Sequence, residues 1–251
     1  MAIIGIGALD NYNVVIERSE KAISSDISVI VFAHTGSPTP SISGIDYHLT
    51  DNPEKEMIDT LIQGKIDGAV RGTLPSHSTL RYLKQRTGVD YLERIAFLET
   101  YNGEKFLLAP VGIDEGSTIN DKVRLIRSAE RLADLIHIPR SVAILSGGRL
   151  DDVGRDPGID RSLADAELLA RITGGFHAEI LIEDAIGRYG IIIAPDGVSG
   201  NLIFRTLVLL GSGTSHGAPV INIDVTFVDT SRASRYYDNA IRLAAALGKS
   251  K

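Results

Sequence analysis

The chain has 251 residues, 43% of them hydrophobic and 23% charged, which is typical of a globular protein with one large or two small domains. The net charge of −6 argues against a nucleic-acid-binding protein, because such binding depends on neutralising phosphates. Cysteine is absent, which excludes disulfides, thiolate metal sites and a cysteine nucleophile.

The N-terminus, MAIIGIGALD, has no basic segment and no long apolar core, so we expect no signal peptide. No apolar run approaches the roughly 20 residues that a membrane span requires. A cytoplasmic protein without membrane contact is the simplest expectation. Gly5-Ile6-Gly7 lacks the third glycine of a dinucleotide fingerprint and is more typical of a tight turn after an edge strand.

The first third of the chain alternates between apolar runs and helix signals. A buried strand is predicted at 28–33, a surface loop at 34–52, a helix that starts at Pro53 and ends near Gln63, a strand at 66–70 and a helix at 80–86. This alternation predicts an α/β fold with a mostly parallel sheet.

The loop at 71–79 combines a strand-end arginine, Arg71, with several hydroxyl groups, including those of Ser78 and Thr79. A capped helix follows it, and helix N-termini and guanidinium groups both favour phosphate. The loop therefore predicts a phosphate-binding segment, although a solvated loop without a ligand fits equally well.

Asn102-Gly103 lies between two apolar runs, 92–98 and 106–111, and predicts a β-hairpin. A hairpin inside an alternating pattern suggests that a second domain begins near Tyr91. Further elements are predicted as a long amphipathic helix at 119–136, strands at 142–145 and 178–182, and a helix at 161–172.

Ser146 and Gly147 open a glycine-rich loop directly after the strand at 142–145, where backbone amides can bind an oxyanion. The aspartates that follow have no EF-hand spacing, and the six histidines never fall at i, i+4. The sequence therefore predicts no metal site.

The stretch 191–238 organises the rest of the chain. A strand at 191–194 leads through a turn to Gly200 and Asn201, where the first turn of an apolar helix, 202–210, could bind an anion. The helix should be largely buried, because Arg205 is its only charge. A strand at 220–228 would then deliver Ser231 and Arg232 to the carboxyl edge of a sheet, where α/β folds bind ligands.

Asp238 lies on the first turns of the last predicted helix, 234–247, and can point back toward Ser231. An acidic residue at this position is also stabilised by the helix dipole alone, so its presence has two explanations.

Together these segments resemble the phosphate acetyl/butyryltransferase superfamily. The similarity lies in GNLIFRTLVLLGSGT after a strand that ends in Pro-Asp, in VTFVDTSRAS, in SVAILS before a glycine-rich loop, and in GAVRGT followed by His-Ser-Thr. Within the superfamily the chain is most similar to the MtxX group, the methyltransferase-related methanogenesis marker proteins of archaea.

The resemblance implies two α/β/α domains with a cleft between them, and a homodimer formed through the second domain. The first domain would comprise 1–90 and 219–251, and the inserted second domain 91–218. In the transacylases, matching residues help a coenzyme A thiol to attack an acyl phosphate. The resemblance therefore implies catalytic roles for Ser231, Arg232 and Asp238 in proton transfer and charge stabilisation.

Two positions tied to this chemistry differ from the family pattern. Leu209 stands where the family enzymes carry an arginine that contributes to coenzyme A binding, and only 184–189 fills the place of a longer motif before the Pro-Asp strand. The resemblance therefore implies a phosphorylated or acyl-phosphate substrate and leaves coenzyme A open as a cofactor. The alternative is a non-catalytic accessory protein that binds a methyltransferase of methanogenesis.

Overall fold

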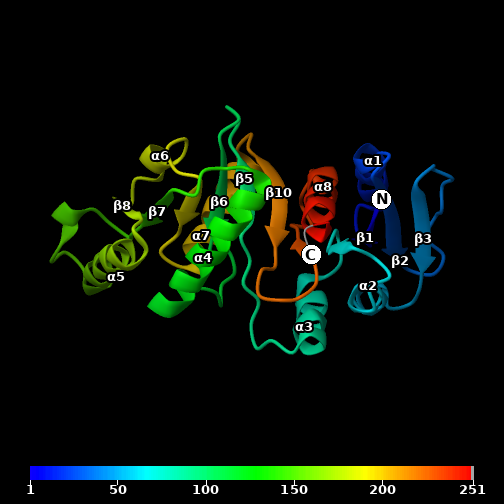
Figure 1. The fold of residues 1–251 in the computed structure, drawn as a ribbon, viewed down its shortest axis with the longest axis horizontal. Coiled ribbons are helices and arrows are strands. Elements are labelled where there is room, and N and C mark those ends of the chain that lie inside the picture. The colour runs from blue at the N-terminus through cyan, green and yellow to red at the C-terminus, as the bar shows by residue number, and fades with distance from the viewer. Residues whose placement is uncertain (250–251) are drawn as a thin grey trace. The chain divides into compact units, whose positions relative to one another are not determined.

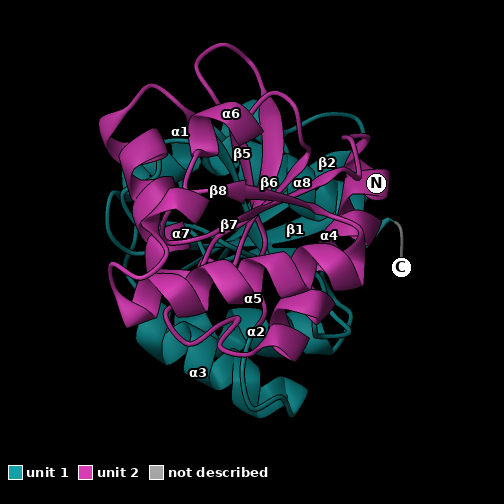
Figure 2. Ribbon diagram, turned by 90° about the vertical axis from the view of Figure 1, so that its left-hand side faces the viewer, with its two compact units in different colours: residues 1–92, 215–251 teal, residues 93–214 magenta. Residues whose placement is uncertain are grey.

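The structure is a computed structural model that describes residues 1–249, and it divides into two compact units. Unit 1 comprises Met1–Leu92 and Ser215–Lys251, and unit 2 comprises Glu93–Thr214 (Figure 2). These divisions lie within a few residues of the domain boundaries predicted at 90 and 218. Residues 250 and 251, the end of the predicted first domain, lie outside the described residues.

The sheet of unit 1 has the strand order β3-β2-β1-β4-β11-β10. β1 pairs in parallel with β2 on one side and β4 on the other, β11 is parallel to β4, and β10 is antiparallel to β11. The strands are β1 (Ala2–Ala8), β2 (Ile27–Ala33), β3 (Ile45–Leu49), β4 (Gly68–Val70), β10 (Thr214–Pro219) and β11 (Phe227–Asp229).

Helices cover both faces of this sheet (Figure 1). α1 (Tyr12–Ala22) and α8 (Tyr237–Gly248) pack together on one face, and α2 (Pro53–Ile62) and α3 (Ser76–Thr87) on the other. The central strands are therefore buried on both sides, as their apolar, β-branched residues require: Ile4, Ile6 and Val31 are fully buried.

The sheet of unit 2 has the order β5-β6-β9-β7-β8, in which β5 and β6 form the predicted antiparallel hairpin and the others are parallel. α4 and α5 pack side by side against it. The strands are β5 (Ala96–Glu99), β6 (Lys105–Ala109), β7 (Val142–Leu145), β8 (Phe176–Glu179) and β9 (Ile191–Ile193); the helices are α4 (Ile119–Ile136), α5 (Pro157–Thr173), α6 (Ile182–Ala185) and α7 (Gly197–Phe204), with a 3-10 turn at Leu150–Asp152 and a π-helix at Arg205–Leu210 after α7.

Four predicted elements differ from the structure. The strand predicted at 178–182 is β8, which ends at Glu179, and Ile182 already begins α6. β1 is a central strand and not an edge strand; its glycines allow neighbours to approach, since a Cβ on Gly5 would meet Ile66 and Phe32. β3 lies inside the predicted loop 34–52. The predicted strand 220–228 is shorter in the structure, where β11 is Phe227–Asp229. Val220 donates a backbone hydrogen bond to Phe227, and the Asn222 side chain donates to the carbonyl of Tyr91 at 2.9 Å.

The apolar helix predicted at 202–210 is helical but is not buried. Leu202 is 59% exposed and Leu210 86% exposed, and Val208 is the buried residue of the π-helix. The prediction was wrong because apolar residues on all sides of a helix require burial from all sides, and packing within this chain covers only part of the surface. Among residues 1–249, no helix is long and apolar enough to cross a membrane.

Candidate functional site

The carboxyl ends of β1 and β4 form a topological switch point in unit 1. The chain proceeds from β1 to β2 and β3 on one side, and then returns to β4 on the other side of β1. Connections that leave neighbouring parallel strands in opposite directions open a crevice there, and open α/β sheets bind their ligands at such a crevice.

Two glycines allow the turn after β4 to fold against the end of β1. Gly72 has φ +61, and a Cβ at this position would collide with the carbonyl oxygen of Gly7. The close approach is fixed by two hydrogen bonds, from the Thr73 amide to the Gly7 carbonyl at 3.0 Å and from the Leu9 amide to the Thr73 hydroxyl at 2.8 Å. The start of the 71–79 loop is therefore rigidly attached to β1.

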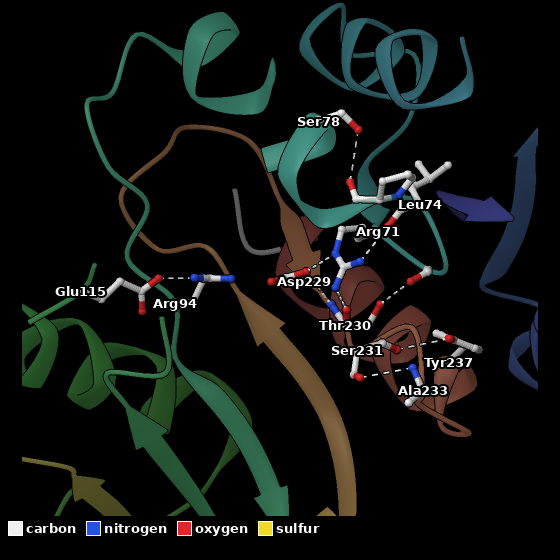
Figure 3. A network of polar contacts seen from close by, with 12 residues as sticks. Arg71, Leu74, Ser78, Arg94, Glu115, Asp229, Thr230, Ser231, Ala233 and Tyr237 are labelled. Atoms are coloured by element: carbon white, nitrogen blue, oxygen red, sulfur yellow. Dashed lines mark hydrogen bonds and ion pairs between the residues drawn. The ribbon is translucent and has the colours of Figure 1, made fainter. Parts of the chain in front are cut away.

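Arg71 is buried and joins this turn to the end of β11 (Figure 3). Its Nε donates to the carboxylate of Asp229, Nη2 to the Thr230 carbonyl, and Nη1 to the Leu74 carbonyl at 2.7 Å. The guanidinium is thus hydrogen-bonded to protein groups. Arg71 influences the site by holding Thr230, the residue before Ser231, in place. Direct contact between Arg71 and a ligand stays a prediction.

Ser231 and Arg232 follow β11 after Thr230 and lie at the carboxyl edge, as the sequence pattern predicted. The phenol of Tyr237 donates to the carbonyls of both residues, at 3.2 and 3.1 Å. Arg232 is exposed, and its Nη1 lies 3.6 Å from the carboxylate of Asp10, which follows β1. The Ser-Arg segment is therefore held by its backbone, while the Arg232 side chain faces solvent beside one carboxylate.

Tyr237 is fully buried, and its burial raises the pKa of the phenol to about 12. The charge of Arg71 lowers this pKa and that of Asp10 raises it, but both effects are smaller than that of burial. The hydroxyl therefore keeps its proton over the physiological range and remains a hydrogen-bond donor to the Ser231 and Arg232 carbonyls.

Asp238 lies in the first turn of α8, as predicted, but its carboxylate faces two arginines. Oδ2 is 3.0 Å from Arg242 and Oδ1 is 3.8 Å from Arg18 on α1. Among residues 1–249, no hydrogen bond or ion pair joins Asp238 to Ser231 or Arg232. A catalytic role for Asp238 stays a prediction, and it requires the side chain to leave this position.

Ser78 and Thr79 lie in the first turns of α3 but in different surroundings. Ser78 lines a cavity of about 410 Å³, together with the cationic side chains of Lys55 and Arg81. Thr79 is fully buried, and its hydroxyl has no hydrogen-bond partner within the described part of the chain. Ser78 is therefore the accessible hydroxyl of the pair, in a cavity where the two cations are joined by the carboxylate of Glu54.

In unit 2, the predicted segments 146–149 and 196–201 follow the neighbouring strands β7 and β9. The Ser146 hydroxyl donates to the Gly148 carbonyl and lies 2.9 Å from Nε2 of His177, and the Gly147 amide donates to the Ser162 hydroxyl at 2.9 Å. These groups already have partners inside the protein. Oxyanion binding by Ser146 and Gly147 stays a prediction.

Gly200 and Asn201 hold α7 against the segment after β6. A Cβ on Gly200 would collide with the Pro110 carbonyl, and the Asn201 amide donates to the Val111 carbonyl at 3.1 Å. The same segment is fixed by Glu115, which accepts from Arg94 at 2.6 Å and from the Gly112 amide at 2.9 Å (Figure 3). Anion binding at the α7 N-terminus stays a prediction.

Sequence reasoning missed three residues of the site: Asp10, Asp229 and Tyr237. Asp229 directly precedes the Thr-Ser-Arg segment, so its place at a strand end was a visible signal. Arg232, the partner of Asp10, is distant in sequence, and no residue pattern around Tyr237 indicates that its hydroxyl bonds to the carbonyls of Ser231 and Arg232. No group of three or more metal-ligating side chains occurs among residues 1–249.

Comparison with known proteins shows the family and the fold of the chain. A protein of Methanosarcina mazei described as "Putative methyltransferase mtx subunit X" is 42% identical over 253 residues, which cover 97% of this chain and 89% of the relative. A branched-chain phosphotransacylase from Enterococcus faecalis superimposes with a TM-score of 0.74 at 18% identity, covering 98% of this chain and 99% of that structure.

A phosphotransacetylase from Streptococcus pyogenes superimposes with a TM-score of 0.71 at 15% identity, covering 100% of this chain and 95% of that structure. No protein-family model matches the chain. The structural matches show a phosphotransacetylase-like α/β fold with a mixed sheet. From the sequence match, the chain belongs to the family of proteins described as "Putative methyltransferase mtx subunit X", which confirms the predicted resemblance to the MtxX group.

Proposed function

We propose that this protein is a transferase of the phosphotransacylase type, which binds an acyl phosphate or another phosphorylated small molecule at the carboxyl edge of unit 1. The observation that carries the proposal is the placement of Ser231 and Arg232 at the β1/β4 switch point, on a fold shared with phosphotransacylases. The exposed guanidinium of Arg232 would bind the phosphoryl group, with Asp10 as the protein group that the ligand displaces.

The arrangement supports charge stabilisation more directly than proton transfer. Arg232 supplies positive charge at the strand end, and Lys55 and Arg81 supply it in the cavity beside Ser78, where the carboxylate of Glu54 offsets part of it. Developing negative charge on a departing phosphate is stabilised by such groups. Proton removal by Asp238 is the weaker part of the proposal, because two arginines compete for this carboxylate.

A transfer assay tests the activity. Acetyl phosphate and butyryl phosphate are supplied with coenzyme A or with water as acceptor, and acyl transfer is followed for the wild type, Arg232→Ala and Asp238→Asn. We expect Arg232→Ala to reduce kcat/KM by at least about a hundredfold, as loss of a charge-stabilising donor does. Equal activity of wild type and Arg232→Ala would contradict the assignment of the site.

The same family membership supports a second candidate function. Since the Methanosarcina mazei relative is described as a subunit of a methyltransferase, we propose as the alternative a non-catalytic accessory protein that binds a methyltransferase of methanogenesis. Recovery of a methyltransferase subunit with the purified protein, together with absence of acyl transfer from every acyl phosphate supplied, would favour this alternative.

We also propose a homodimer formed through unit 2. The exposed apolar helix from Gly197 to Leu210 supports it, because a partner that covers Leu202 and Leu210 removes apolar surface from water and so lowers the free energy of the system. A second copy of the chain supplies the same surface in return, as two-fold symmetric interfaces require.

A further inference from the structure

Lys122 is a buried cation that no part of the proposed function uses. It lies on the second turn of α4 and is 9% exposed. Its Nζ reaches the end of β9 and donates a hydrogen bond to the carbonyl of Pro195 at 2.6 Å. The ammonium is therefore fixed at the carboxyl edge of the unit 2 sheet.

The ammonium lacks a direct counter-ion. Of its three N–H groups, one bonds to Pro195, and within the described residues no carboxylate lies within ion-pair distance of Nζ. Burial lowers the pKa of Lys122, and the charges of Asp165 and Asp196 oppose this shift without reversing it. Since buried charges in proteins are usually paired, the missing partner requires an explanation.

The position of the Lys122 ammonium in the fold explains why it lacks a direct counter-ion among residues 1–249. β7 and β9 are neighbouring parallel strands, and Ile144 pairs with Ile193, so Ser146 and Pro195 stand equally far beyond the paired residues. From β7 the chain continues through α5 to β8, whereas from β9 it continues into α7, which packs beside β6. The two connections diverge, so Lys122 lies at a second topological switch point, the place where such sheets bind ligands.

The loop after β7 adds a second unfilled donor. The amide N–H of Gly148 has no hydrogen-bond partner among residues 1–249, although Gly148 is buried and its carbonyl accepts from Ser146. Buried backbone N–H groups are rarely left unpaired. Each of these donors, beyond the end of one of two adjacent strands, favours an oxygen acceptor, although the carboxylate of Asp152 also lies beside Gly148.

We propose that Lys122 is the centre of an oxyanion-binding site in unit 2, which takes the phosphate or carboxylate group of a small molecule. The ligand oxygen accepts hydrogen bonds from the free N–H groups of the ammonium and so supplies the missing negative charge. The residues that carry this proposal all belong to unit 2, and it stands or falls independently of the transferase proposal.

Binding of inorganic phosphate and of acetate, titrated separately by calorimetry into Arg232→Ala protein, tests the site without contribution from the unit 1 edge. We expect at least one of the two anions to bind, and Lys122→Met in this background to weaken that binding about tenfold or more, the loss typical of one charge-assisted hydrogen bond. Lys105→Met, which removes an exposed lysine, is the matched control and should leave binding unchanged.

A lysine with a purely structural role predicts a different result. Arg232→Ala protein that binds neither anion, or a Lys122→Met change that leaves binding of both intact, would overturn the proposal.

Chemical protection provides a test on wild-type protein that needs no variant. Phosphate or acetate should slow acetylation of Lys122 by acetic anhydride relative to Lys105, as read by mass spectrometry, and equal rates with and without both anions would also overturn it.

Discussion

Arg71 is the residue whose predicted and observed surroundings differ most. The sequence places a cation at a strand end beside hydroxyl-rich residues, which favours phosphate, and it contains no local indication that Asp229 lies opposite. In the structure this pair is buried on both sides, with 6% and 10% of the two side chains exposed. Partners more than 150 positions away in sequence decided the outcome, and no periodic pattern carries that information.

Replacing Arg71 with Met should therefore affect stability before it affects binding. The variant leaves the Asp229 carboxylate buried without its cation, and we expect the free energy of unfolding to fall by about 3–5 kcal/mol. Urea denaturation at pH 7 measures the loss. The double variant Arg71→Met, Asp229→Asn removes the unpaired charge and should recover part of it; no recovery would show that the pair is not the cause.

The buried cation of Lys122 predicts a pH dependence of stability. Its folded-state pKa is lowered from the ordinary 10.5, so between the two values the unfolded chain holds a proton that the folded chain has released. The free energy of unfolding should therefore rise with pH across this interval. Comparison of denaturation curves at several pH values with those of Lys122→Met tests this, and an identical pH profile in the variant would contradict it.

At the scale of elements, helices with local signals were predicted well. The helix at 119–136 has the predicted bounds, because its apolar periodicity and its Thr118 N-cap both depend on residues that are close together in sequence. Strands were harder: β3 has an alternating, mostly exposed pattern inside a proline-rich segment, and β10 has no local strand signal but pairs with β11 at Ala218 and Pro219. Pairing between distant segments fixes such strands, and the local sequence does not.

The cap of α4 provides a test at this scale. The Thr118 hydroxyl accepts from the Asp121 amide at 3.1 Å, and the Asp121 carboxylate accepts from the Thr118 amide at 2.9 Å. Thr118→Ala removes one half of this capping box and should reduce the free energy of unfolding by about 1 kcal/mol. Thermal denaturation measures the change; Ser117→Ala, outside the cap position, should have a smaller effect.

At the scale of the molecule, the family and the α/β class could be predicted from sequence, while the exposure of the helix from Gly197 to Leu210 could not. Its apolar composition indicates burial but does not state whether the cover comes from the same chain. The dimer proposal explains why an apolar helix is exposed in the single chain: a second copy of the chain would bury it.

Leu202→Asp should weaken such a dimer without destabilising the single chain, since the side chain is already 59% exposed. We expect sedimentation velocity to show a shift from dimer to monomer at micromolar concentration. Leu135→Asp, at a residue 50% exposed on α4, is the matched control and should remain dimeric. A monomeric wild type, or a Leu202→Asp variant that sediments as the wild type does, would exclude this interface.

The central claim is that the exposed guanidinium of Arg232 binds the phosphoryl group of a small molecule at the edge of unit 1. Calorimetric titration of acetyl phosphate into Lys122→Met protein, with and without Arg232→Ala, measures it most directly, because the second anion site is then removed. We predict that Arg232→Ala weakens binding about tenfold or more while the melting temperature stays the same, as expected for loss of a charge-assisted hydrogen bond from an exposed side chain. Equal affinities in the two proteins would contradict the claim.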